Sequence, residues 1–457
     1  MAAPTPGERG AFGSRLGFVF AAAGSAIGLG NIWRFPYAAG ENGGGAFVLV
    51  YLICVALIGV PVLLAELSVG RAGQRNPVGA FKALVPSRFW PLVGGLGVLT
   101  GFGILSFYSV VAGWTVGYLY RALTGQFLGG LSPEQSKAAF EELIADPVRA
   151  MVLTASFLLL TILVVRGGVH KGIERATKVL MPVFFALLLF LAGRSVTLPG
   201  AEKGIDFLLQ ADFSRLGPRA LLDALGQALF SLSLGMGAMI TYGSYLGRDE
   251  NLPSAGLTVA FFDTLIALLA GFMIFPALFA TGMDPAQGAG LVFVVLPTIF
   301  DQLPGGLYFA IAFYALLMIA ALTSTISLLE VVVAYFADEK GWAREKAVWV
   351  VGLGSFVLAV PSALSVGAVD VLGSLLGRWS FLDLQDMIFG NFALSVGAFF
   401  IALFVGWKWG TGPALAEMSA GGHHLPAPGL WAQLVRYLCP VAVAAVFGFL
   451  IWTYATG

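Results

Sequence analysis

The feature that most constrains the fold of this chain is a series of eleven apolar stretches, because a helix that crosses a bilayer needs roughly 20 such residues. The stretches cover residues 13–37, 45–70, 91–122, 149–165, 174–193, 222–246, 256–281, 307–336, 346–362, 385–407 and 431–454. Lipid offers no partner to backbone N–H and C=O groups, so such spans satisfy them internally as helices. Only 11% of the residues are charged, against about 25% in soluble domains. The sequence therefore predicts an all-α polytopic membrane protein with about 11 transmembrane helices.

The segments between these stretches are too short for a second domain, so we expect residues 1–457 to form a single transmembrane domain. Residues 284–307 are too short and too interrupted to span, which favours a loop that contains short helices. The adjacent pair His423 and His424 is not expected to bind a metal. The net charge is zero, which gives no indication of nucleic acid binding. No obligatory protein partner is evident.

The distribution of Lys and Arg predicts the orientation, because basic residues favour short loops on the cytoplasmic side. The loops after the first and seventh stretches contain none, whereas those after the second, fourth and eighth contain several. The long loop between the fifth and sixth stretches also contains basic residues, but long loops weigh less in this rule. This alternation predicts a cytoplasmic N-terminus.

Two of the stretches are interrupted at mid-membrane depth. The first contains GSAIGLGN (residues 24–31) and the sixth contains SLSLGMG (residues 231–237), so each combines hydroxyl side chains with a G-x-G sequence. Interrupted helices at matching positions of two halves are the best indication of a transporter's binding site. The alternative is that the glycines only allow close helix packing. That alternative explains Gly97 and Gly101 in the third stretch, but it explains GSAIGLGN poorly because small residues occur there on every face.

Ionisable side chains at membrane depth are costly and usually functional. Those in or beside the stretches are Glu66, Asp263, Glu330, Asp383, Asp386 and Arg34. The eighth stretch adds the hydroxyl-rich sequence AALTSTIS (residues 320–327), although these hydroxyls could instead bond to their own helix. A hard cation such as sodium prefers oxygen ligands. Unwound carbonyls could supply such ligands, together with the side chains of Asn31, Ser231, Asp263, Thr323 and Ser324.

Four motifs give the chain a resemblance to a known family. They are RLGFVFAAAGSAIGLGNIWRFPYAAGENGGGAF (15–47), RGGVHKGIERATKVLMP (166–182), GQALFSLSLGMGAMITYGSY (226–245) and ALTSTIS (321–327). Together they resemble the neurotransmitter:sodium symporter family, especially its bacterial amino-acid transporters, over nearly the whole chain. The resemblance implies two inverted five-helix repeats, about 13–193 and 222–407, with helices 1 and 6 broken. An additional helix would cover about 431–454.

The resemblance also implies the binding residues. The first sodium site would contain Ala26, Asn31, Ser231 and Asp263. The second would contain Gly24, Ile27, Ala320, Thr323 and Ser324. The substrate would contact Ser25, Ala26, Leu29, Gly30, Ile104, Tyr108, Phe230, Ser231, Ser233, Met236, Ser324 and Leu328. Its carboxylate would meet the first sodium, the amides of Leu29 and Gly30 and the hydroxyl of Tyr108. The helix N-terminus after the break favours such an anion through its partial positive charge.

One departure from the family concerns Asp263, because family members often carry Asn at this position and animal members add a chloride nearby. A fixed carboxylate would supply that negative charge, so we expect chloride-independent transport, with Asp263 protonated on the return step. The far end of the substrate pocket would be formed by uncharged residues, and Met236 stands where an aromatic residue is common. A flexible methionine leaves room for larger ligands. We therefore expect hydrophobic L-amino acids, from leucine size to aromatic.

The resemblance further implies two gates. On the outer side Arg34 and Asp386 would pair above the substrate, with Phe230 as a lid and Gln227 nearby, and Asp383 is the rival partner of Arg34. On the cytoplasmic side the path would be closed by Arg9, Tyr245 and Asp338. Exposed ion pairs contribute only about 0–1 kcal/mol, so such gates can open readily. Glu66 is expected to accept hydrogen bonds from the broken sixth helix, and Glu330 is assigned no role.

These features predict a sodium-coupled symporter that imports amino acids by alternating access in a bacterial inner membrane. Its partners would be an L-amino acid, sodium ions at two sites and the lipid bilayer. The alternative is an amino-acid-binding membrane sensor that uses the same pocket without transport. A channel is disfavoured because no span carries a ring of charges or a filter sequence. An enzyme is disfavoured because no nucleophile–base pair or metal-ligand set is present.

Overall fold

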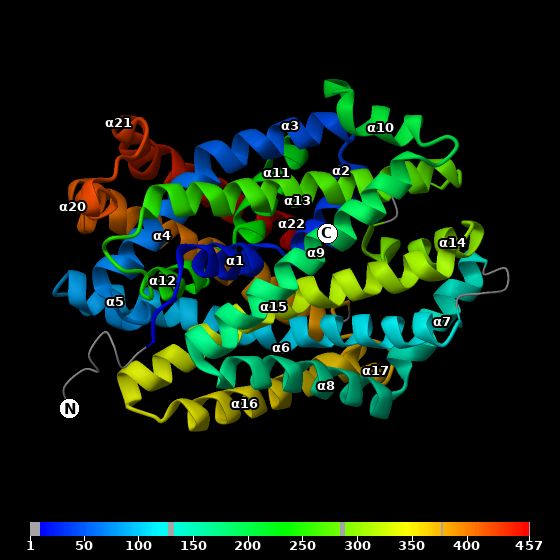
Figure 1. The fold of residues 1–457 in the computed structure, drawn as a ribbon, viewed down its shortest axis with the longest axis horizontal. Helices are drawn as coiled ribbons and strands as arrows, with labels where there is room; N and C mark the ends of the chain where they lie inside the picture. The colour runs from blue at the N-terminus through cyan, green and yellow to red at the C-terminus, as the bar shows by residue number, and fades with distance from the viewer. Residues whose placement is uncertain (1–9, 127–131, 284–287, 376–377, 457) are drawn as a thin grey trace.

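The protein is a bundle of long helices that run along its longest axis (Figure 1). The structure, a computed structural model, describes residues 10–126, 132–283, 288–375 and 378–456. Within these residues no β-strand forms, and the only strand-like pairings are two isolated bridges. The predicted all-α membrane fold is therefore confirmed.

Most of the helical elements build the predicted spans, and the label η marks π-helical or 3-10 segments. These elements are α1 (Arg15–Ala26), η1 (Gly30–Arg34), α2 (Phe35–Glu41), α3 (Gly45–Cys54), η2 (Val55–Gly59), α4 (Val60–Gly73), α6 (Trp90–Leu123), α8 (Pro147–Arg166), η3 (Val169–Glu174), α9 (Arg175–Val196), α11 (Pro218–Ser231), α12 (Ala238–Gly243), α13 (Leu252–Ala280), α15 (Gly306–Lys340), α16 (Arg344–Ser365), α18 (Phe381–Gln385), η6 (Asp386–Ala393), α19 (Leu394–Leu403), η7 (Phe404–Lys408), α21 (Pro428–Gln433), η9 (Leu434–Leu438) and α22 (Cys439–Thr456).

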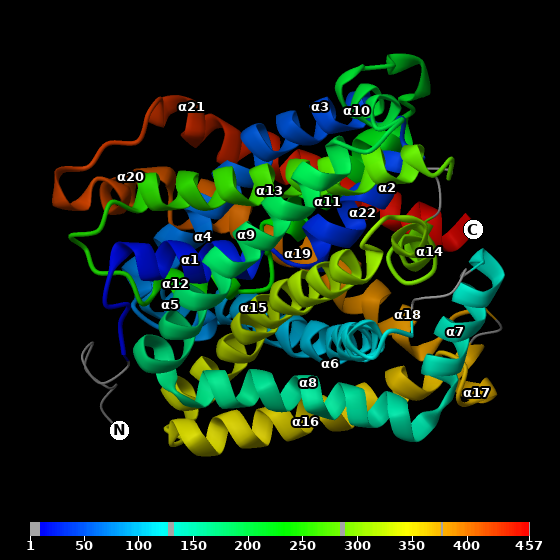
Figure 2. The same ribbon diagram turned by 45° about the vertical axis from the view of Figure 1, so that its right-hand side comes forward.

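The remaining elements are short and lie near the two ends of the bundle. They are α5 (Pro77–Leu84), α7 (Pro133–Ala145), α10 (Glu202–Leu209), η4 (Phe213–Arg215), η5 (Gly288–Leu291), α14 (Val295–Gln302), α17 (Asp370–Gly373), α20 (Thr411–Met418) and η8 (Ala420–Gly422). Elements η5 and α14 fall within the predicted loop at 284–307, whose first residues lie outside the described part of the chain. In Figure 2, α7, α10 and α14 lie toward one end, and α5, α20 and α21 lie toward the other.

The number of spans is consistent with the eleven predicted. Nine helices of the described residues are long and apolar enough to cross a membrane, and a bent pair formed by Arg15–Ala26 and Gly30–Glu41 makes ten. The predicted span at 222–246 is divided into α11 and α12, and neither piece is long enough alone. The two predicted interruptions therefore coincide with the two broken helices.

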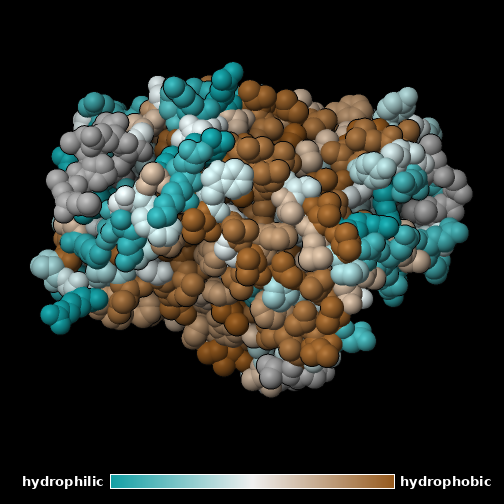
Figure 3. Space-filling view, turned by 90° about the horizontal axis from the view of Figure 1, so that it is seen from below, coloured by the Kyte–Doolittle hydropathy of each residue, from teal (hydrophilic) through white to brown (hydrophobic). Residues whose placement is uncertain are grey.

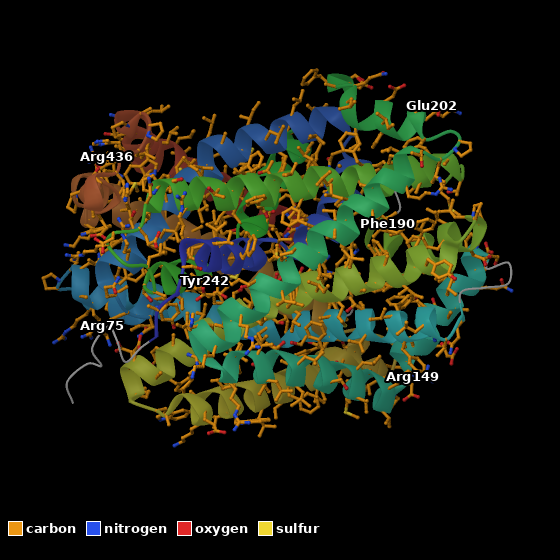
Figure 4. The ribbon with its side chains drawn as sticks, viewed as in Figure 1. Arg75, Arg149, Phe190, Glu202, Tyr242 and Arg436 are labelled. Atoms are coloured by element: carbon orange, nitrogen blue, oxygen red, sulfur yellow. The ribbon has the colours of Figure 1, made fainter. Side chains whose placement is uncertain are left out.

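The surface has the pattern expected of a protein that crosses a bilayer. Seen from the side of α8 and α16, a broad hydrophobic band separates more hydrophilic regions at the two ends (Figure 3). Charged side chains gather at these ends, with Arg75 and Arg436 at one and Arg149 and Glu202 at the other (Figure 4).

The first helix, α1, begins after the N-cap residue Ser14, whose side chain accepts a hydrogen bond from the amide of Gly17.

The broken helices lie inside the bundle, where α1 packs against α9, α13 and α15. Helix α6 supports the second break with two glycines, as expected from the packing interpretation. A Cβ atom at Gly97 would lie 3.3 Å from the amide nitrogen of Gly237, and one at Gly101 would lie 3.6 Å from the carbonyl oxygen of Met236. Gly97 therefore lets the backbone of the second break approach α6 closely, whereas a Cβ at Gly101 would make only an ordinary contact.

Candidate functional site

The first break begins where α1 ends in the interior of the bundle. Ile27 has an extended backbone (φ −75°, ψ 106°), and the two halves of the span are bent by 50°. The freed amide of Leu29 donates to the hydroxyl oxygen of Tyr108 on α6 (3.0 Å). A Cβ atom at Gly28 would lie 2.5 Å from Oγ of Ser324 on α15. Glycine at this position thus leaves room for the hydroxyls of Ser324 and Tyr108.

The second break covers residues 232–237, between α11 and α12. Ser233, Gly235 and Gly237 have positive φ angles of 55°, 84° and 77°, a conformation that glycine adopts without strain. The hydroxyl of Ser233 donates to the carbonyl oxygen of Ser25 in the first span (2.8 Å). The amide of Gly235 donates to Oε1 of Glu66 (2.7 Å). The role predicted for Glu66, as an acceptor for the broken sixth helix, is therefore observed.

The residues of the predicted first sodium site meet between the two breaks. The side chains of Asn31, Ser231 and Asp263 are fully buried, and Ala26 lies at the end of α1. Nδ2 of Asn31 donates to Oδ1 of Asp263 (2.7 Å), and Oγ of Ser231 donates to both carboxylate oxygens (2.8 Å). The hydroxyl of Tyr51 lies 3.5 Å from Oδ2 of the same carboxylate. The sequence analysis did not assign Tyr51 to this site. The only signal was its hydroxyl, a polar group within the otherwise apolar second stretch.

The charge of Asp263 has no basic partner within ion-pair distance among the residues that the structure describes. A buried carboxylate is costly unless a cation or a proton compensates it. The oxygens of Asp263 and Ser231 are of the kind that sodium prefers. Oδ1 of Asn31 accepts a hydrogen bond from the amide of Gly28 (3.1 Å), so the amide would have to give up this bond and rotate by 180° to present its oxygen to a cation beside Asp263. The group is therefore chemically suited to a small cation.

The residues of the predicted second sodium site also come together, where α15 faces the first break. Oγ1 of Thr323 and Oγ of Ser324 lie 3.5 Å and 3.4 Å from the carbonyl oxygen of Ile27. A Cβ atom at Gly24 would lie 3.1 Å from Cβ of Thr323. Thr323 also donates to the carbonyl oxygen of Ala320 on its own helix (3.0 Å). The bonds that these hydroxyls make to their own helix therefore coexist with their position opposite the break.

A cavity between the breaks contains most of the predicted substrate contacts. Its lining comprises Ser25, Ala26, Gly28, Gly30, Ile104, Tyr108, Phe230, Ser233, Met236, Ser324, Ser327 and Leu328. Gly28 and Ser327 were not predicted, although both lie in motifs that the sequence singled out. Oγ of Ser25 donates to Oγ of Ser327 (2.7 Å). Two predicted residues are not in this lining: Ser231 turns its hydroxyl to Asp263, and Leu29 lines a neighbouring cavity instead.

A second cavity of about 410 Å³ lies next to the first, with Phe230 and Tyr108 in the lining of both. It also contains Arg34 and Asp386, the predicted outer gate. The guanidinium of Arg34 lies 4.6 Å from the centre of the Phe230 ring. No ion pair joins Arg34 to Asp386 within the described residues. Their pairing stays a prediction for a closed state.

The carboxylates beside this outer cavity have other partners. Asp386 accepts a hydrogen bond from Nδ2 of Asn391 (3.0 Å). Asp383 accepts from the backbone amide of Ser380 (3.0 Å) and forms the capping box at the start of α18. Both carboxylates therefore have local partners, and the choice between them as the partner of Arg34 stays a prediction. Gln227 donates from Nε2 to the carbonyl oxygen of Gly30 (2.8 Å), which places it beside the first break.

The predicted gate at the other end of the bundle is described only in part, because Arg9 lies outside the described residues. The carboxylate of Asp338 accepts from the backbone amide of Asn76 (2.8 Å). The hydroxyl of Tyr245 donates to Oε1 of Glu330 (2.6 Å). Tyr245 and Asp338 make further interactions, so neither is free. Their role as a gate stays a prediction.

Glu330, to which the sequence assigned no role, is the buried centre of a network at the same end. Its carboxylate forms an ion pair with Arg344 (2.5 Å) and accepts the hydrogen bond from Tyr245. Arg344 also donates to the carbonyl oxygen of Val165 (2.9 Å). The network connects α15, α16, α8 and the end of the sixth span. Sequence reasoning missed Arg344, because the sequence does not distinguish a basic residue between two spans that faces water from one that pairs with a buried carboxylate.

A second buried carboxylate, Glu174, fixes the beginning of the first span. It accepts from the amide of Gly13 (2.6 Å) and from the hydroxyl of Ser14 (3.0 Å). It also forms an ion pair with Lys178 (2.6 Å) and lies 2.8 Å from Nδ1 of His170. This contact holds the N-terminal segment against η3 and α9. The only sequence signal was a Glu inside a basic motif.

The comparisons with known proteins agree with this geometry. A profile described as "Sodium:neurotransmitter symporter family" matches residues 9–130 and 141–456. A sodium-dependent transporter of Bacillus subtilis, YhdH, is 42% identical, with 95% of this chain and 96% of that protein covered. A sodium-dependent transporter of Haemophilus influenzae is 36% identical over 96% of this chain and 98% of its own length.

A solved structure is similar over almost the full length. The crystal structure of MhsT in complex with L-phenylalanine has a TM-score of 0.88 and 48% sequence identity, and the match covers 96% of this chain and 99% of that one. This chain therefore belongs to the sodium:neurotransmitter symporter family, whose members are sodium-coupled transporters and not enzymes.

Proposed function

We propose that this protein imports hydrophobic L-amino acids together with sodium by alternating access. The observation that carries the proposal is the cavity at the meeting point of the two breaks, where freed backbone groups face apolar side chains. An amino acid presents two charged groups and one variable side chain, which such a cavity suits. The similarity to MhsT, which was solved with L-phenylalanine, supports an aromatic ligand.

The proposed pose follows from the polar groups around the cavity. The substrate carboxylate replaces the Tyr108 hydroxyl as partner of the Leu29 amide and accepts a hydrogen bond from that hydroxyl. It also approaches the amide of Gly30, as an anion does at a helix N-terminus. The ammonium group meets the carbonyls near Ala26, Phe230 and Ser231, where α1 and α11 end.

The side-chain end of the cavity supports a hydrophobic substrate, and its free volume of about 30 Å³ means that a large side chain requires the lining residues to move apart. Ile104, Met236 and Leu328 supply an apolar surface, and no charged residue belongs to the lining. The flexible Met236 can move for a bulky ring. Ser25 and Ser327 add hydroxyls that can bond to each other or to a polar atom on an aromatic ring. A lysine or glutamate side chain would lack a counter-charge there.

Sodium enters the proposal as the second transported species, at two sites. The first is the group around Asp263, where the ion would also contact the substrate carboxylate. The second lies between the first break and the hydroxyls of Thr323 and Ser324. The fixed carboxylate of Asp263 makes chloride unnecessary, and its protonation compensates its buried charge when sodium has left.

The proposed orientation places the N-terminus in the cytoplasm of a bacterial cell, with the transporter in the inner membrane. The basic loops after the second, fourth and eighth spans support this choice. Arg34 and Asp386 then close the outer path, while Arg9, Tyr245 and Asp338 close the inner one. The inverted relation of residues 13–193 and 222–407 is part of the same proposal, since the breaks occur at matching places.

Uptake of radiolabelled phenylalanine into proteoliposomes tests the proposal. An inward sodium gradient should drive accumulation, and an equal choline gradient should not. Tyr108→Phe should lower uptake, whereas Tyr120→Phe, on the exposed surface of the same helix, should not. If lysine or glutamate competed best in a panel of amino acids, the hydrophobic specificity would be wrong. Sodium-dependent binding without counterflow would instead favour the sensor.

A further inference from the structure

A groove on the surface of the protein shares no lining residue with the two cavities described above. It is formed by α5, α6, α15 and α16 and has a volume of about 750 Å³. Its lining is almost entirely apolar and includes Leu92, Leu99, Phe102, Phe336 and Val350. The single charged residue of the lining is Lys82. The groove is therefore an apolar surface cleft with one basic side chain.

The groove opens toward lipid and not toward water. Leu92, Leu99 and Val350 are 68%, 53% and 46% exposed, and they belong to two helices that are long and apolar enough to cross a membrane. At Gly95, an added Cβ atom would find no heavy atom within 4 Å. The floor of the groove is thus bare at this point, with space for a flexible hydrocarbon chain.

The charged residue marks one end of the groove. Lys82 lies on α5, between the second and third spans, and its Nζ pairs with Glu339 at the end of α15 (2.5 Å). Its side chain remains 49% exposed, whereas that of Glu339 is 13% exposed. A second cation, Lys346, lies 4.6 Å from the ring of Trp342, which stacks on the groove residue Phe336 (4.5 Å). An anion at this end would therefore meet Lys82 directly, with Lys346 one aromatic layer away.

The position of this end matches the headgroup layer of the cytoplasmic leaflet. In the proposed orientation, α6 and α16 begin and α15 ends on that side of the membrane. Aromatic residues such as Trp342 favour the same depth, where their rings meet both lipid and water. Anionic lipids of the cytoplasmic leaflet attract basic residues near the surface.

We propose that the groove is a binding site for one anionic phospholipid of the cytoplasmic leaflet. One acyl chain lies along α6 between α15 and α16, over Gly95, and the phosphate pairs with the exposed half of Lys82. Glu339 keeps Lys82 at the end of the groove and is itself turned inward, where Asn76 lies 3.5 Å from it. The inference rests on the proposed orientation and is independent of the transported substrate.

Native mass spectrometry of the delipidated full-length protein tests this site with two lipids that have the same chains, dioleoylphosphatidylglycerol and dioleoylphosphatidylcholine. We expect one phosphatidylglycerol to bind more tightly than phosphatidylcholine. Gly95→Phe should abolish this binding by filling the groove. Gly193→Phe on α9 is the matched control, since a Cβ there also meets nothing within 4 Å. Lys82→Gln should weaken phosphatidylglycerol about fivefold and phosphatidylcholine less, because choline offsets the charge of its phosphate.

Equal binding of the two lipids would overturn the assignment to an anionic headgroup. Unchanged binding to a folded Gly95→Phe protein would overturn the assignment to this groove. If that variant did not fold, Lys82→Gln would decide, because the exposed Lys82 side chain can be replaced without filling any space. An unchanged affinity in Lys82→Gln would then refute the proposed contact.

Discussion

The substitution Asp263→Asn tests the proposed first sodium site with little change in shape. The carboxylate of Asp263 is fully buried and accepts hydrogen bonds from Asn31 and Ser231 at 2.7–2.8 Å. An amide oxygen can accept from the same donors, so the variant should fold. What it lacks is the negative charge that a bound cation would neutralise. Sodium binding should therefore weaken, while the structure without sodium should not be destabilised.

The expected size of the effect follows from the burial of the site. An interaction with a charged group contributes about 1.5–3 kcal/mol, and each 1.4 kcal/mol is a factor of ten in affinity. We expect the half-saturating sodium concentration for phenylalanine binding to rise roughly 10- to 140-fold. Because the substrate carboxylate would touch the same ion, phenylalanine affinity at low sodium should fall with it.

Two assays distinguish this reasoning from general damage. Equilibrium binding of radiolabelled phenylalanine across a sodium titration gives the half-saturating concentration, and Asp223→Asn in the outer cavity is the control that should leave it unchanged. Thermal unfolding gives a second measure. In choline buffer Asp263→Asn should melt no lower than the parent protein, whereas saturating sodium should stabilise only the parent strongly. An unchanged sodium requirement in Asp263→Asn would refute the site.

Three further outcomes are expected. Gly28→Ala should lower phenylalanine affinity at saturating sodium, because its Cβ would lie 2.5 Å from Oγ of Ser324, while Gly226→Ala, whose Cβ meets nothing within 4 Å, should leave binding unchanged. Replacement of chloride by gluconate should not alter sodium-driven uptake into proteoliposomes, and a loss of uptake would contradict the role given to the fixed carboxylate. Glu66→Ala should cost about 1–3 kcal/mol of unfolding free energy, because the amide of Gly235 loses its partner. Glu66→Gln keeps an acceptor, so a melting temperature as low as that of Glu66→Ala would contradict this explanation.

The sequence was sufficient to predict the fold, because its signals are local. A run of apolar residues predicts a helix wherever it occurs, as the agreement of 91–122 with Trp90–Leu123 illustrates. The breaks were equally predictable, since GSAIGLGN and SLSLGMG place polar and glycine residues where a helix in lipid should have none. The backbone leaves the helix at both. The role of Glu66 could be predicted because a carboxylate at membrane depth needs hydrogen-bond donors, and the amides freed by the break are such donors.

The contacts that were missed depend on how helices are rotated against one another. Ser327 enters the substrate cavity because α15 turns that face toward Ser25, which the spacing in AALTSTIS does not reveal. Tyr51 joins the group around Asp263 from a different span. Arg344 reaches Glu330 from the first residue of α16, in a basic segment that in the sequence suggests only orientation. In each case the residue can be read from the sequence, but its contact partner is known only once the helices are packed together.

The geometry of the first break gives a physical reason for coupling sodium to the substrate. Ser25 offers its carbonyl oxygen to the hydroxyls of Ser233 and Ser324, while the amide of Leu29 faces Tyr108. Both proposed sodium sites and the proposed substrate site therefore depend on the conformation of the same few residues. Fixing the backbone of one residue costs about 1–2 kcal/mol. An ion that orders this segment first removes that cost for the substrate, and by linkage the substrate favours the ion equally. Helices that continued unbroken would lack this shared segment, so the interruption that supplies the ligands also supplies the coupling.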